Sequence, residues 1–403
     1  MSVLEKVRTY RLDEIAEISS GVTLGRKLDH AELVELPYLR VANVQDGHLD
    51  LTDVKTVSVR PSEVERFRLR PGDLVMTEGG DKDKLGRGTL WTGELPMCLH
   101  QNHIFRVRVK PELVIPKFLA WFIRSQQARA YFLRSAKQTT NLATINSTQL
   151  KALPVALPPV DEQRRIAAIL DQADALRDKR RQALAQVEQL TQSVYLEMFG
   201  DGSEWISLGL EEFCATSADI KCGPFGTQLL REEFTTSGVP LWGIKQVNAG
   251  FKTETHEFLT KRKAEELAAY SILPGDIVMT RKGTVGNCAV YPDSYPPGVM
   301  HSDLLRVRVD CKRFSPPFVS AQLHFSPQVE RQIRLISGGA IMPGINVGKL
   351  KGITLAAPPL ELQQDFARRV EGIERLKAAH RRSLEEMDAL FASLQHRAFR
   401  GEL

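Results

Sequence analysis

The sequence predicts an α+β protein with a pseudo-two-fold internal repeat: two mixed, mainly β domains separated by two long helices that pair as an antiparallel coiled coil. Three observations predict this fold class. Blocks of sequence recur about 200 residues apart, strand-like runs between turn residues fill the first part of each copy, and a long run without such residues closes each copy. The length of 403 residues also exceeds that of one ordinary core.

The repeat is visible in blocks that keep their order along the chain. Residues 106–109 (RVRV) recur at 306–309, which is 200 residues later. Residues 71–77 (PGDLVMT) recur as PGDIVMT at 274–280, which is 203 residues later. Such a small change of spacing is what loop variation produces. The period is far longer than that of a solenoid repeat, so it indicates a duplicated domain.

The first part of each copy, about 150 residues, is rich in β-branched residues, Gly and Pro. Short strand-like runs, such as 105–109 and 276–280, alternate with Pro-Gly-Asp turns. A helical stretch follows in each copy, at 116–132 and at 316–336. This pattern predicts a mixed, mainly β domain in each copy.

Each copy ends in a predicted long helix. Nothing between residues 160 and 199 is Pro or Gly, and the matching run to residue 399 contains only Gly372. Two prolines precede each run, and Asp161 or Glu361 lies at its start, as is typical of helix starts. The predicted segments are a domain at 1–157, a helix at 158–200, a domain at 201–357 and a helix at 358–403.

Apolar residues on the two runs fall at matched positions, mostly three or four residues apart, as in a heptad seam. A gap in the seam holds Arg180 in one helix and His380 in the other, and a polar residue in a seam commonly fixes its register. A run of about 38 residues spans nearly 60 Å, longer than the face of such a domain, which favours pairing over packing of each helix on its own domain. The predicted seam includes Ile166, Leu176, Val187 and Leu190 on the first helix and Phe366, Leu376, Met387 and Leu390 on the second.

The bulk composition is that of a folded protein in water, with 42% hydrophobic and 26% charged residues. A net charge of +5 permits a polyanionic partner without demanding one. The five scattered cysteines form no CxxC pair, so we expect neither a metal site nor disulfides, and a reduced compartment fits them best. With no signal-peptide pattern and no apolar run of about 18 residues, we expect a cytoplasmic protein without a membrane span.

The order of domain, helix, domain and helix resembles the DNA-specificity subunit of type I restriction–modification systems, over essentially the whole chain. The resemblance rests on LPPVDEQRRI at 157–166 and PPLELQ at 358–363, which are similar to the family's helix-start motif, and on the closing AFRGEL at 398–403. The repeated PGD turns also occur in the recognition domains of that family. One departure is LQQD at 362–365, where the family often has a Glu-Gln pair followed by basic residues.

The resemblance implies a non-catalytic chain with no metal site. Each domain would be a target-recognition domain for one half of an asymmetric bipartite site on double-stranded DNA. The helices would space the two halves and dock two modification (methyltransferase) subunits, which would carry S-adenosylmethionine and methylate adenine at N6. Restriction (translocase and nuclease) subunits would join the complex and use ATP and Mg, so no cofactor is expected in this chain.

Three loop sets per domain offer side chains that could contact DNA. Base edges are bound by Arg, Lys, Asn or Gln, and phosphates also by Ser and Thr. The first set follows the PGD strand, the second follows the strand of Pro37 or Pro240, and the third follows the helical stretch. Each residue alone fits ordinary solvated polarity, but at least one loop per domain should contact DNA if the resemblance holds. The candidates are Asn43, Gln45, Thr77, Lys82, Lys84, Arg87, Thr140 and Asn141 in the first domain, and Lys245, Gln246, Asn248, Thr280, Arg281 and Lys282 in the second.

Two other functions stay open. Residues 315–318 (SPPF) match the pattern with which amino-methyltransferases hold a target amino group, which would make the chain a stand-alone adenine methyltransferase. The matching residues 115–118 (IPKF) lack that motif but keep its second and fourth residues, so a helix start is favoured. No glycine-rich loop for a methyl donor follows a strand. The third hypothesis is a coiled-coil interaction protein without a DNA role.

Overall fold

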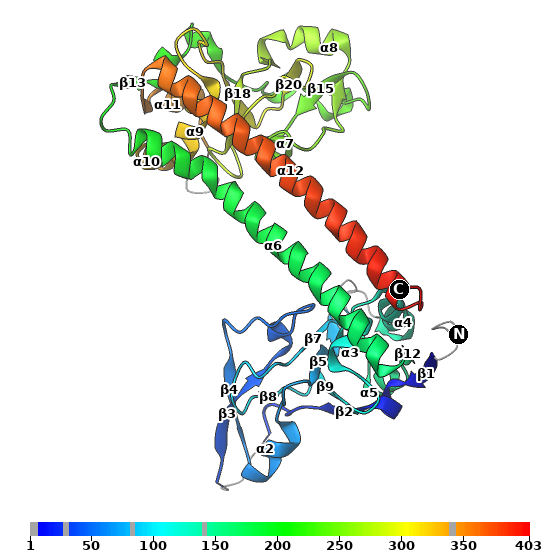
Figure 1. Cartoon of the computed structure of the whole chain (residues 1–403). Coiled ribbons are helices and arrows are strands. Elements are labelled where there is room, and N and C mark those ends of the chain that lie inside the picture. Colours follow the sequence, from blue (N-terminus) through cyan, green and yellow to red (C-terminus); the bar gives the residue numbers. More distant parts are fainter. Residues whose placement is uncertain (1–6, 27–31, 81–84, 139–142, 338–343) are drawn as a thin grey trace. The chain divides into compact units, whose positions relative to one another are not determined.

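The computed structural model describes residues 7–26, 32–80, 85–138, 143–337 and 344–403. The chain forms two compact units: the first comprises residues 1–181 and 382–403, and the second comprises residues 182–381 (Figure 1). Each unit contains one β-rich domain and one part of each long helix, α6 (Val160–Phe199) and α12 (Leu360–Ala398).

The β-rich domain of the first unit is built on a four-stranded antiparallel sheet. Its strand order is β2 (Ala16–Ser20), β9 (Ile104–Val109), β5 (Leu74–Thr77) and β7 (Gly88–Leu90). A second sheet has the order β4 (Lys55–Val59), β3 (Val34–Leu39) and β8 (Leu99–His100), with β3 and β8 parallel. Helices α3 (Pro116–Ile123) and α4 (Gln126–Ser135) share the core of the first sheet with residues of both long helices.

The second unit repeats this topology. One sheet has the order β14 (Ile220–Cys222), β21 (Leu304–Val307), β18 (Ile277–Thr280) and β19 (Cys288–Val290). The other has the order β16 (Phe258–Leu259), β15 (Val239–Trp242), β20 (Gly298–Met300) and β17 (Ser271–Ile272), and here β15 and β20 are the parallel pair. Helices α9 (Pro316–Phe325) and α10 (Pro327–Ile336) correspond to α3 and α4. The predicted α+β fold with an internal repeat is therefore confirmed.

The repeated Pro-Gly-Asp turn has the same structural role in both units. Asp73 and Asp276 are 1% and 2% exposed. Each accepts two hydrogen bonds from one arginine, Arg108 or Arg308, at 2.7–2.8 Å. A buried carboxylate is tolerated when it is paired and hydrogen-bonded in this way. The block that recurs most clearly in the sequence therefore fixes the strand β5 or β18 against its neighbour.

Both long helices are tied to the rest of their unit by a buried glutamine in the first turn. Gln163 and Gln363 are 1% and 0% exposed. Gln163 accepts the backbone N–H of Ile115 at 2.9 Å, and Gln363 accepts that of Ser315 at 3.0 Å. Their Nε2 groups donate to backbone carbonyls that precede the helix. The Pro-Pro segments of the sequence thus lead into a helix whose first turn is locked to the residue before α3 or α9.

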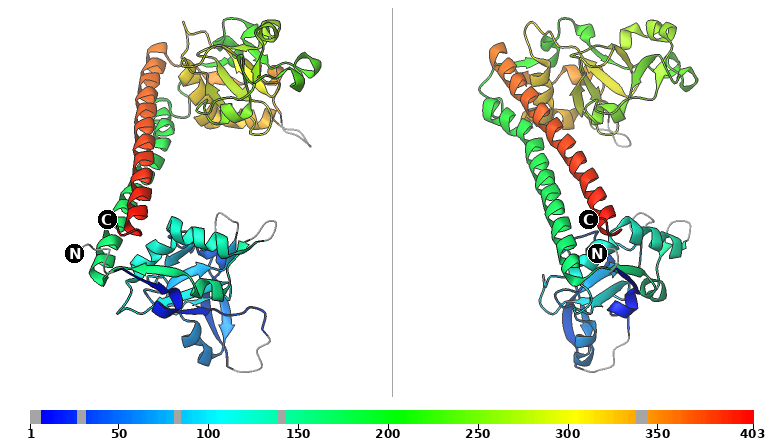
Figure 2. Two further views of the ribbon diagram at one scale, coloured as in Figure 1. Left: turned by 90° about the vertical axis from the view of Figure 1, so that its right-hand side faces the viewer. Right: turned by 45° about the vertical axis from the view of Figure 1, so that its right-hand side comes forward.

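Within each unit the parts of α6 and α12 run antiparallel (Figure 2). As residue numbers rise along α6, the numbers of their partners fall along the C-terminal segment. In the first unit the contacts are Arg165 with the carbonyl of Leu403 (2.8 Å) and Arg177 with Asp388 (2.6 Å); in the second they are Glu188 with Arg381 (3.3 Å) and Thr191 with Lys377 (3.3 Å).

The seam between the helices differs in register from the predicted one. Leu176 and Leu376 are 55% and 43% exposed, so their prediction as seam residues is wrong. Leu190 and Leu390, at 39% and 58%, are exposed as well. In each case the residue that follows the leucine occupies the seam, and two of these four residues are long basic side chains. The residues concerned are Arg177, Thr191, Lys377 and Phe391.

The polar seam residues contact the opposite helix. The Arg177 guanidinium lies 4.2 Å from the centre of the Phe391 ring, and Lys377, only 7% exposed, donates to Thr191. Arginine and lysine can bury their stems in this way while their charged ends find partners. Of the other predicted seam residues, Ile166, Val187 and Phe366 are buried, whereas Arg180, His380 and Met387 are half-buried.

Candidate nucleic-acid interface

Two of the predicted loop sets of the first domain are connected to strands of one small sheet. Strand β6 (Gly79–Gly80) pairs with β11 (Ala143–Thr144), which pairs with β10 (Lys137–Gln138). The strands approach so closely that a Cβ on Gly79 would lie 2.7 Å from a methyl carbon of Thr144, which explains the glycine. The start of the first loop set therefore lies beside the strand that follows the third. The candidates Lys82, Lys84, Thr140 and Asn141 lie outside the described residues.

The second loop set of this domain meets the first through a pair of side chains. Gln45 Oε1 accepts a hydrogen bond from Arg87 Nη1 at 3.0 Å, and Arg87 Nη2 points to the Val41 carbonyl at 3.5 Å. The Gln45 amide nitrogen donates to the carbonyl of Ala42 at 2.7 Å. Gln45 and Arg87 are both half-buried. All three predicted loop sets thus converge in the first domain.

Gln45 and Arg87 line a shallow hollow of about 270 Å³ that is rich in cations. Arg124 in this lining pairs with Asp46 at 3.1 Å and approaches Asp174 of α6 at 4.0 Å. An excess of basic groups around one hollow suits a polyanionic ligand. The lining residues are Gln45, Asp46, His48, Leu85, Gly86, Arg87, Ile123, Arg124 and Arg129.

The loops of the second domain converge in the same way. Asn248 Oδ1 accepts hydrogen bonds from Thr284 Oγ1 at 2.9 Å and from Asn287 Nδ2 at 2.7 Å, which joins the second loop set to the first. The backbone N–H of Ile345, just after the third loop set, donates to the carbonyl of Arg281 at 3.2 Å. The duplication therefore extends from the framework to the arrangement of the loops.

The predicted cations of the second domain differ in their surroundings. The Arg281 guanidinium lies 4.9 Å from the centre of the Phe225 ring and is half-buried. Lys282 forms an ion pair with Asp303 at 2.9 Å but keeps 53% of its side chain exposed. Lys245 is exposed. Exposed ion pairs contribute little stability, so Lys282 can exchange its carboxylate for a phosphate at low cost.

Thr77 and Thr280 are fully buried, which argues against contact with a phosphate. The Thr280 hydroxyl donates to the carbonyls of Thr284 and Asn287. The Thr77 hydroxyl points to the carbonyl of Arg87 at 3.5 Å. Both residues end a core strand and hold the start of the first loop set. Their prediction as DNA contacts is therefore revised to a structural role.

Asn43 and Gln246 also support the fold, and they do so at matched positions. Asn43 Oδ1 accepts the backbone N–H of Arg40 at 2.8 Å, and Gln246 Oε1 accepts that of Gly243 at 3.2 Å. Asn43 is 3% exposed, so its prediction as a DNA contact is revised as well. Gln246 is half-buried. The two side chains perform the same backbone cap in the two domains.

The sequence-based candidates omit Thr284 and Asn287, which bind Asn248, and Arg124 and Arg129, which line the cationic hollow. A signal for Asn287 exists in the repeat, because it lies 200 residues after Arg87. The two arginines lie within the predicted helical stretch 116–132, and a helical pattern gives no indication that they face a loop.

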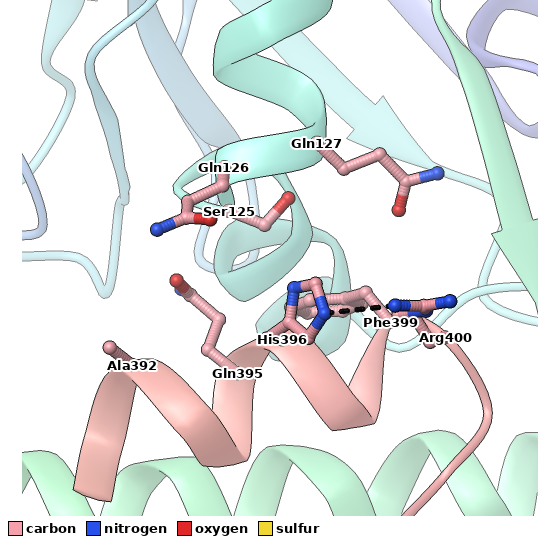
Figure 3. Close-up of a pocket in the computed structure, with 8 residues that line it drawn as sticks. All are labelled: Ser125, Gln126, Gln127, Ala392, Gln395, His396, Phe399 and Arg400. Atoms are coloured by element: carbon pink, nitrogen blue, oxygen red, sulfur yellow. Dashed lines mark hydrogen bonds between the residues drawn. The ribbon is translucent and has the colours of Figure 1, made fainter. Parts of the chain in front are cut away.

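A larger hollow of about 550 Å³ lies in the first unit between α4 and the last turns of α12 (Figure 3). Six of its eight lining residues are polar, and Arg400 Nη1 lies 3.2 Å from His396 Nε2. The residue that matches Gln395 in the second unit is Tyr195, whose ring contacts Phe325 and Phe366. The hollow thus marks a place where the repeat is asymmetric. Its lining residues are Ser125, Gln126, Gln127, Ala392, Gln395, His396, Phe399 and Arg400.

The SPPF segment at 315–318 is a helix start in the structure. Its two prolines open α9, and its serine is 7% exposed. Phe318 is 0% exposed, with its ring centre 4.7 Å from that of Phe199. The matching Phe118 is 1% exposed and packs on Phe399 at 5.6 Å. A phenylalanine enclosed in the core is not available to hold a target base, so the segment gives no support to a methyltransferase.

Over the described parts of the chain, no group of three His, Cys, Asp or Glu side chains could hold a metal ion. The five cysteines are free thiols. No helix among the described residues is both long and apolar enough to cross a bilayer.

Comparisons with known proteins agree on one family. A family model described as "Type I restriction modification DNA specificity domain" matches residues 5–189. The chain is 23% identical to the MjaX specificity subunit assigned to a type I restriction enzyme of Methanocaldococcus jannaschii, over 93% of this chain and 88% of that protein. It is 31% identical to the EcoKI specificity subunit of Escherichia coli K12, over 40% of this chain and 36% of that protein.

Solved structures show the same fold over nearly the whole chain. One, described as "Structural basis underlying complex assembly and conformational transition of the type I R-M system", aligns with a TM-score of 0.62 at 18% identity and covers 99% of this chain and 98% of that chain. The type I restriction–modification S subunit from M. genitalium aligns with a TM-score of 0.56 at 13% identity, over 98% and 96% of the two chains.

Proposed function

This chain belongs to the DNA-specificity subunits of type I restriction–modification systems, and we propose that each of its two β-rich domains binds one half of a bipartite site on double-stranded DNA. The observation that carries the proposal is the convergence of three loop sets at equivalent places in the two domains, through Gln45 with Arg87 and Asn248 with Asn287. Arg, Asn and Gln are the residues that bind base edges, and exposed lysines beside them suit phosphates.

The proposed contacts divide into two kinds. Lys245, Arg281 and Lys282 supply positive charge to the phosphate backbone of one half-site, and Arg129 supplies it to the other. Lys82, Lys84, Thr140 and Asn141 stay predictions for the first half-site. Gln45, Arg87 and Asn248 lie where the loops meet, and we assign them to the bases.

We further propose that the long helices dock two modification subunits. Leu176 and Leu390 flank the seam at one place in the first unit, because the residues that follow them are in contact at 4.2 Å. Leu190 and Leu376 occupy the matching places in the second unit, where the following residues share a hydrogen bond. An exposed leucine pair that occurs once per unit suits two copies of one partner, since exposed apolar clusters mark interaction surfaces.

In this proposal the chain selects the site and the partners perform the chemistry. The modification subunits use S-adenosylmethionine and the restriction subunits use ATP and Mg, so the chain itself needs no cofactor. Its place of action is then the cytoplasm, where the target DNA lies. Two observations favour this division over catalysis by the chain. Phe318 is buried, and Ser315 has the same role as Ile115, since each donates its backbone N–H to the glutamine in the first turn of a long helix.

The DNA proposal is tested by selection. The full chain is purified with its modification subunits and mixed with double-stranded oligonucleotides of random sequence, and the retained DNA is sequenced. We expect two short sequence blocks separated by a spacer of fixed length. Replacing Arg281 and Lys282 by Glu should weaken retention and blur one block only. Retained DNA without any preferred sequence would overturn the proposal.

The docking proposal is tested by co-purification of the modification subunits. Leu176→Glu with Leu390→Glu should remove one of two bound copies, and Leu376→Glu with Leu190→Glu should remove the other. The matched control is Gln182→Glu, an exposed α6 residue outside the leucine pairs. Two copies retained by the chain carrying all four leucine substitutions would contradict the assignment.

A further inference from the structure

Two residues of the second loop set occupy one position in the repeated framework. Asn43 and Gln246 cap equivalent backbone N–H groups, so they mark the same place in the two domains. Gln45 and Asn248 each follow two residues later. The first of these is half-buried and the second exposed. The same capped backbone therefore carries Gln45 in one domain and Asn248 in the other.

Two residues of the facing loop are equivalent as well. The carbonyl of Arg87 accepts the N–H of Thr77 at 3.0 Å, and the carbonyl of Asn287 accepts the N–H of Thr280 at 2.8 Å. Both Arg87 and Asn287 are half-buried. The backbone is thus held in the same way in the two domains, whereas the side chain is a guanidinium in one and an amide in the other.

These positions are joined across the loops by a side-chain hydrogen bond in both domains. It runs from Arg87 to Gln45 at 3.0 Å and from Asn287 to Asn248 at 2.7 Å. The framework and the bond recur, and only the chemistry of the presented groups changes. Such a change is what two domains need if they bind different base pairs through the same surface.

The pair of the first domain offers hydrogen-bond donors. Gln45 uses its oxygen for Arg87 and its nitrogen for Ala42. Arg87 donates one N–H of Nη1 to Gln45 and one of Nη2 to Val41, which leaves a second N–H on each nitrogen with no partner among the described residues. Two donors on neighbouring nitrogens match guanine, which offers the acceptors O6 and N7 in the major groove.

The pair of the second domain offers one donor group and one acceptor. The Asn248 oxygen accepts hydrogen bonds from both Thr284 and Asn287. Among the described residues, the NH₂ group of Asn248 and the side-chain oxygen of Asn287 have no hydrogen-bond partner, so both can bind a base. A donor beside an acceptor matches adenine, which offers the acceptor N7 and the donor N6 in the major groove. The same groups match guanine poorly, because guanine offers two acceptors there.

We infer that these two matched pairs determine the difference between the half-sites: Gln45 and Arg87 bind a guanine, and Asn248 and Asn287 bind an adenine. This inference rests on the proposed function and adds to it the base that each pair selects. Because a bidentate contact contributes about 1–3 kcal/mol of discrimination, each pair should prefer its base by about 5- to 150-fold.

The test exchanges the pairs within the full chain bound to its modification subunits. A chain with Asn248→Gln and Asn287→Arg copies the first pair into the second domain, and random double-stranded DNA is selected as described above. One adenine in one block should be replaced by guanine, while the other block stays unchanged. The reverse exchange, Gln45→Asn with Arg87→Asn, should replace one guanine by adenine in the other block.

Two further variants separate base selection from folding and charge. Arg87→Lys keeps the charge but loses the fork, so the guanine preference should fall while the salt dependence of binding is retained. Lys245→Ala, near Asn248, should weaken binding to all sequences equally. Unchanged blocks in the exchanged and Arg87→Lys chains would overturn the inference and leave the bipartite function standing. Absence of two blocks with the unaltered chain would instead overturn the proposed function.

Discussion

Truncation of Phe318 distinguishes a helix start from a catalytic motif, because the repeat supplies a control. Phe318 and Phe118 are both enclosed, at 0% and 1% exposure. Replacing a buried phenylalanine by alanine costs about 3–5 kcal/mol in total, with the larger losses where more ring contacts are removed. Phe318 contacts the rings of Tyr195, Phe199 and Phe366, so Phe318→Ala should cost about 5 kcal/mol. Phe118→Ala should cost about 4 kcal/mol.

The assay must report the two units separately, since unfolding of a chain with two units need not be two-state. Hydrogen–deuterium exchange of peptides from each unit, measured at increasing urea concentration, gives a free energy of unfolding for each. Phe318→Ala should destabilise peptides of the second unit, and Phe118→Ala those of the first. DNA methylation by the isolated chain, supplied with S-adenosylmethionine, should be undetectable for the unaltered chain and for both variants.

A catalytic role would give the opposite pattern. The unaltered chain would methylate DNA without a partner, Phe318→Ala would abolish this activity at unchanged stability, and Phe118→Ala would have no effect on it. That combination would refute the structural explanation of the SPPF segment. A loss of stability below about 1 kcal/mol for both variants would refute the magnitude derived from burial.

Three further outcomes are expected. Leu170 is 0% exposed, so Leu170→Ala should lower the free energy of unfolding of the first unit by about 2–5 kcal/mol. Replacing the exposed Leu176 by alanine should cost less than about 1 kcal/mol. Equal losses for the two variants in urea titrations would support the seam predicted from the sequence. Burial lowers the pKa of His100 to about 4, so between pH 6.5 and 4 the unfolded chain binds a proton that the folded chain does not. As the pH drops through this window, the unaltered chain should lose about 3 kcal/mol more stability than His100→Asn, and equal losses in the two chains would contradict this. Lys245→Ala and Lys282→Ala should each reduce the slope of log affinity against log salt by about 0.9 at unchanged sequence preference, and an unchanged slope would remove that lysine from the phosphate contacts.

The repeat and the helices could be predicted because their signals are local. A run without Pro or Gly predicts a helix wherever it occurs, and PGD predicts the same turn twice. The seam register could not be obtained in this way. Leu176 and Leu376 satisfy the apolar pattern as well as their neighbours do, and only the contact of Arg177 with Phe391 shows that a basic residue takes the seam position. Binary patterning has no means to assign a buried arginine or lysine.

The candidate site was predictable as a set of loops but not residue by residue. Polar composition selects Asn43 and Gln45 equally, although one caps a backbone N–H in the core and the other lies beside Arg87. Likewise, the sequence alone predicts that a threonine at the end of a strand can bind a phosphate. Thr77 and Thr280 cannot do so, because both are buried. Exposure depends on which loop lies opposite, and that contact joins residues about 40 positions apart in sequence.

Comparison of the two domains distinguishes polar loop residues that support the fold from those that could select DNA. Asn43 and Gln246 differ in side-chain length, yet each accepts an equivalent backbone hydrogen bond, so a requirement of the fold has been met twice by different residues. The carbonyls of Arg87 and Asn287 accept equivalent backbone hydrogen bonds in their two domains. Their side chains cannot present the same groups, so no requirement of the fold explains the difference between them. A difference that the framework tolerates, located where three loop sets meet, is best explained by a difference in what the two domains bind. Domain exchange would follow the same rule: a chain carrying the first domain twice should select the same bases in both blocks.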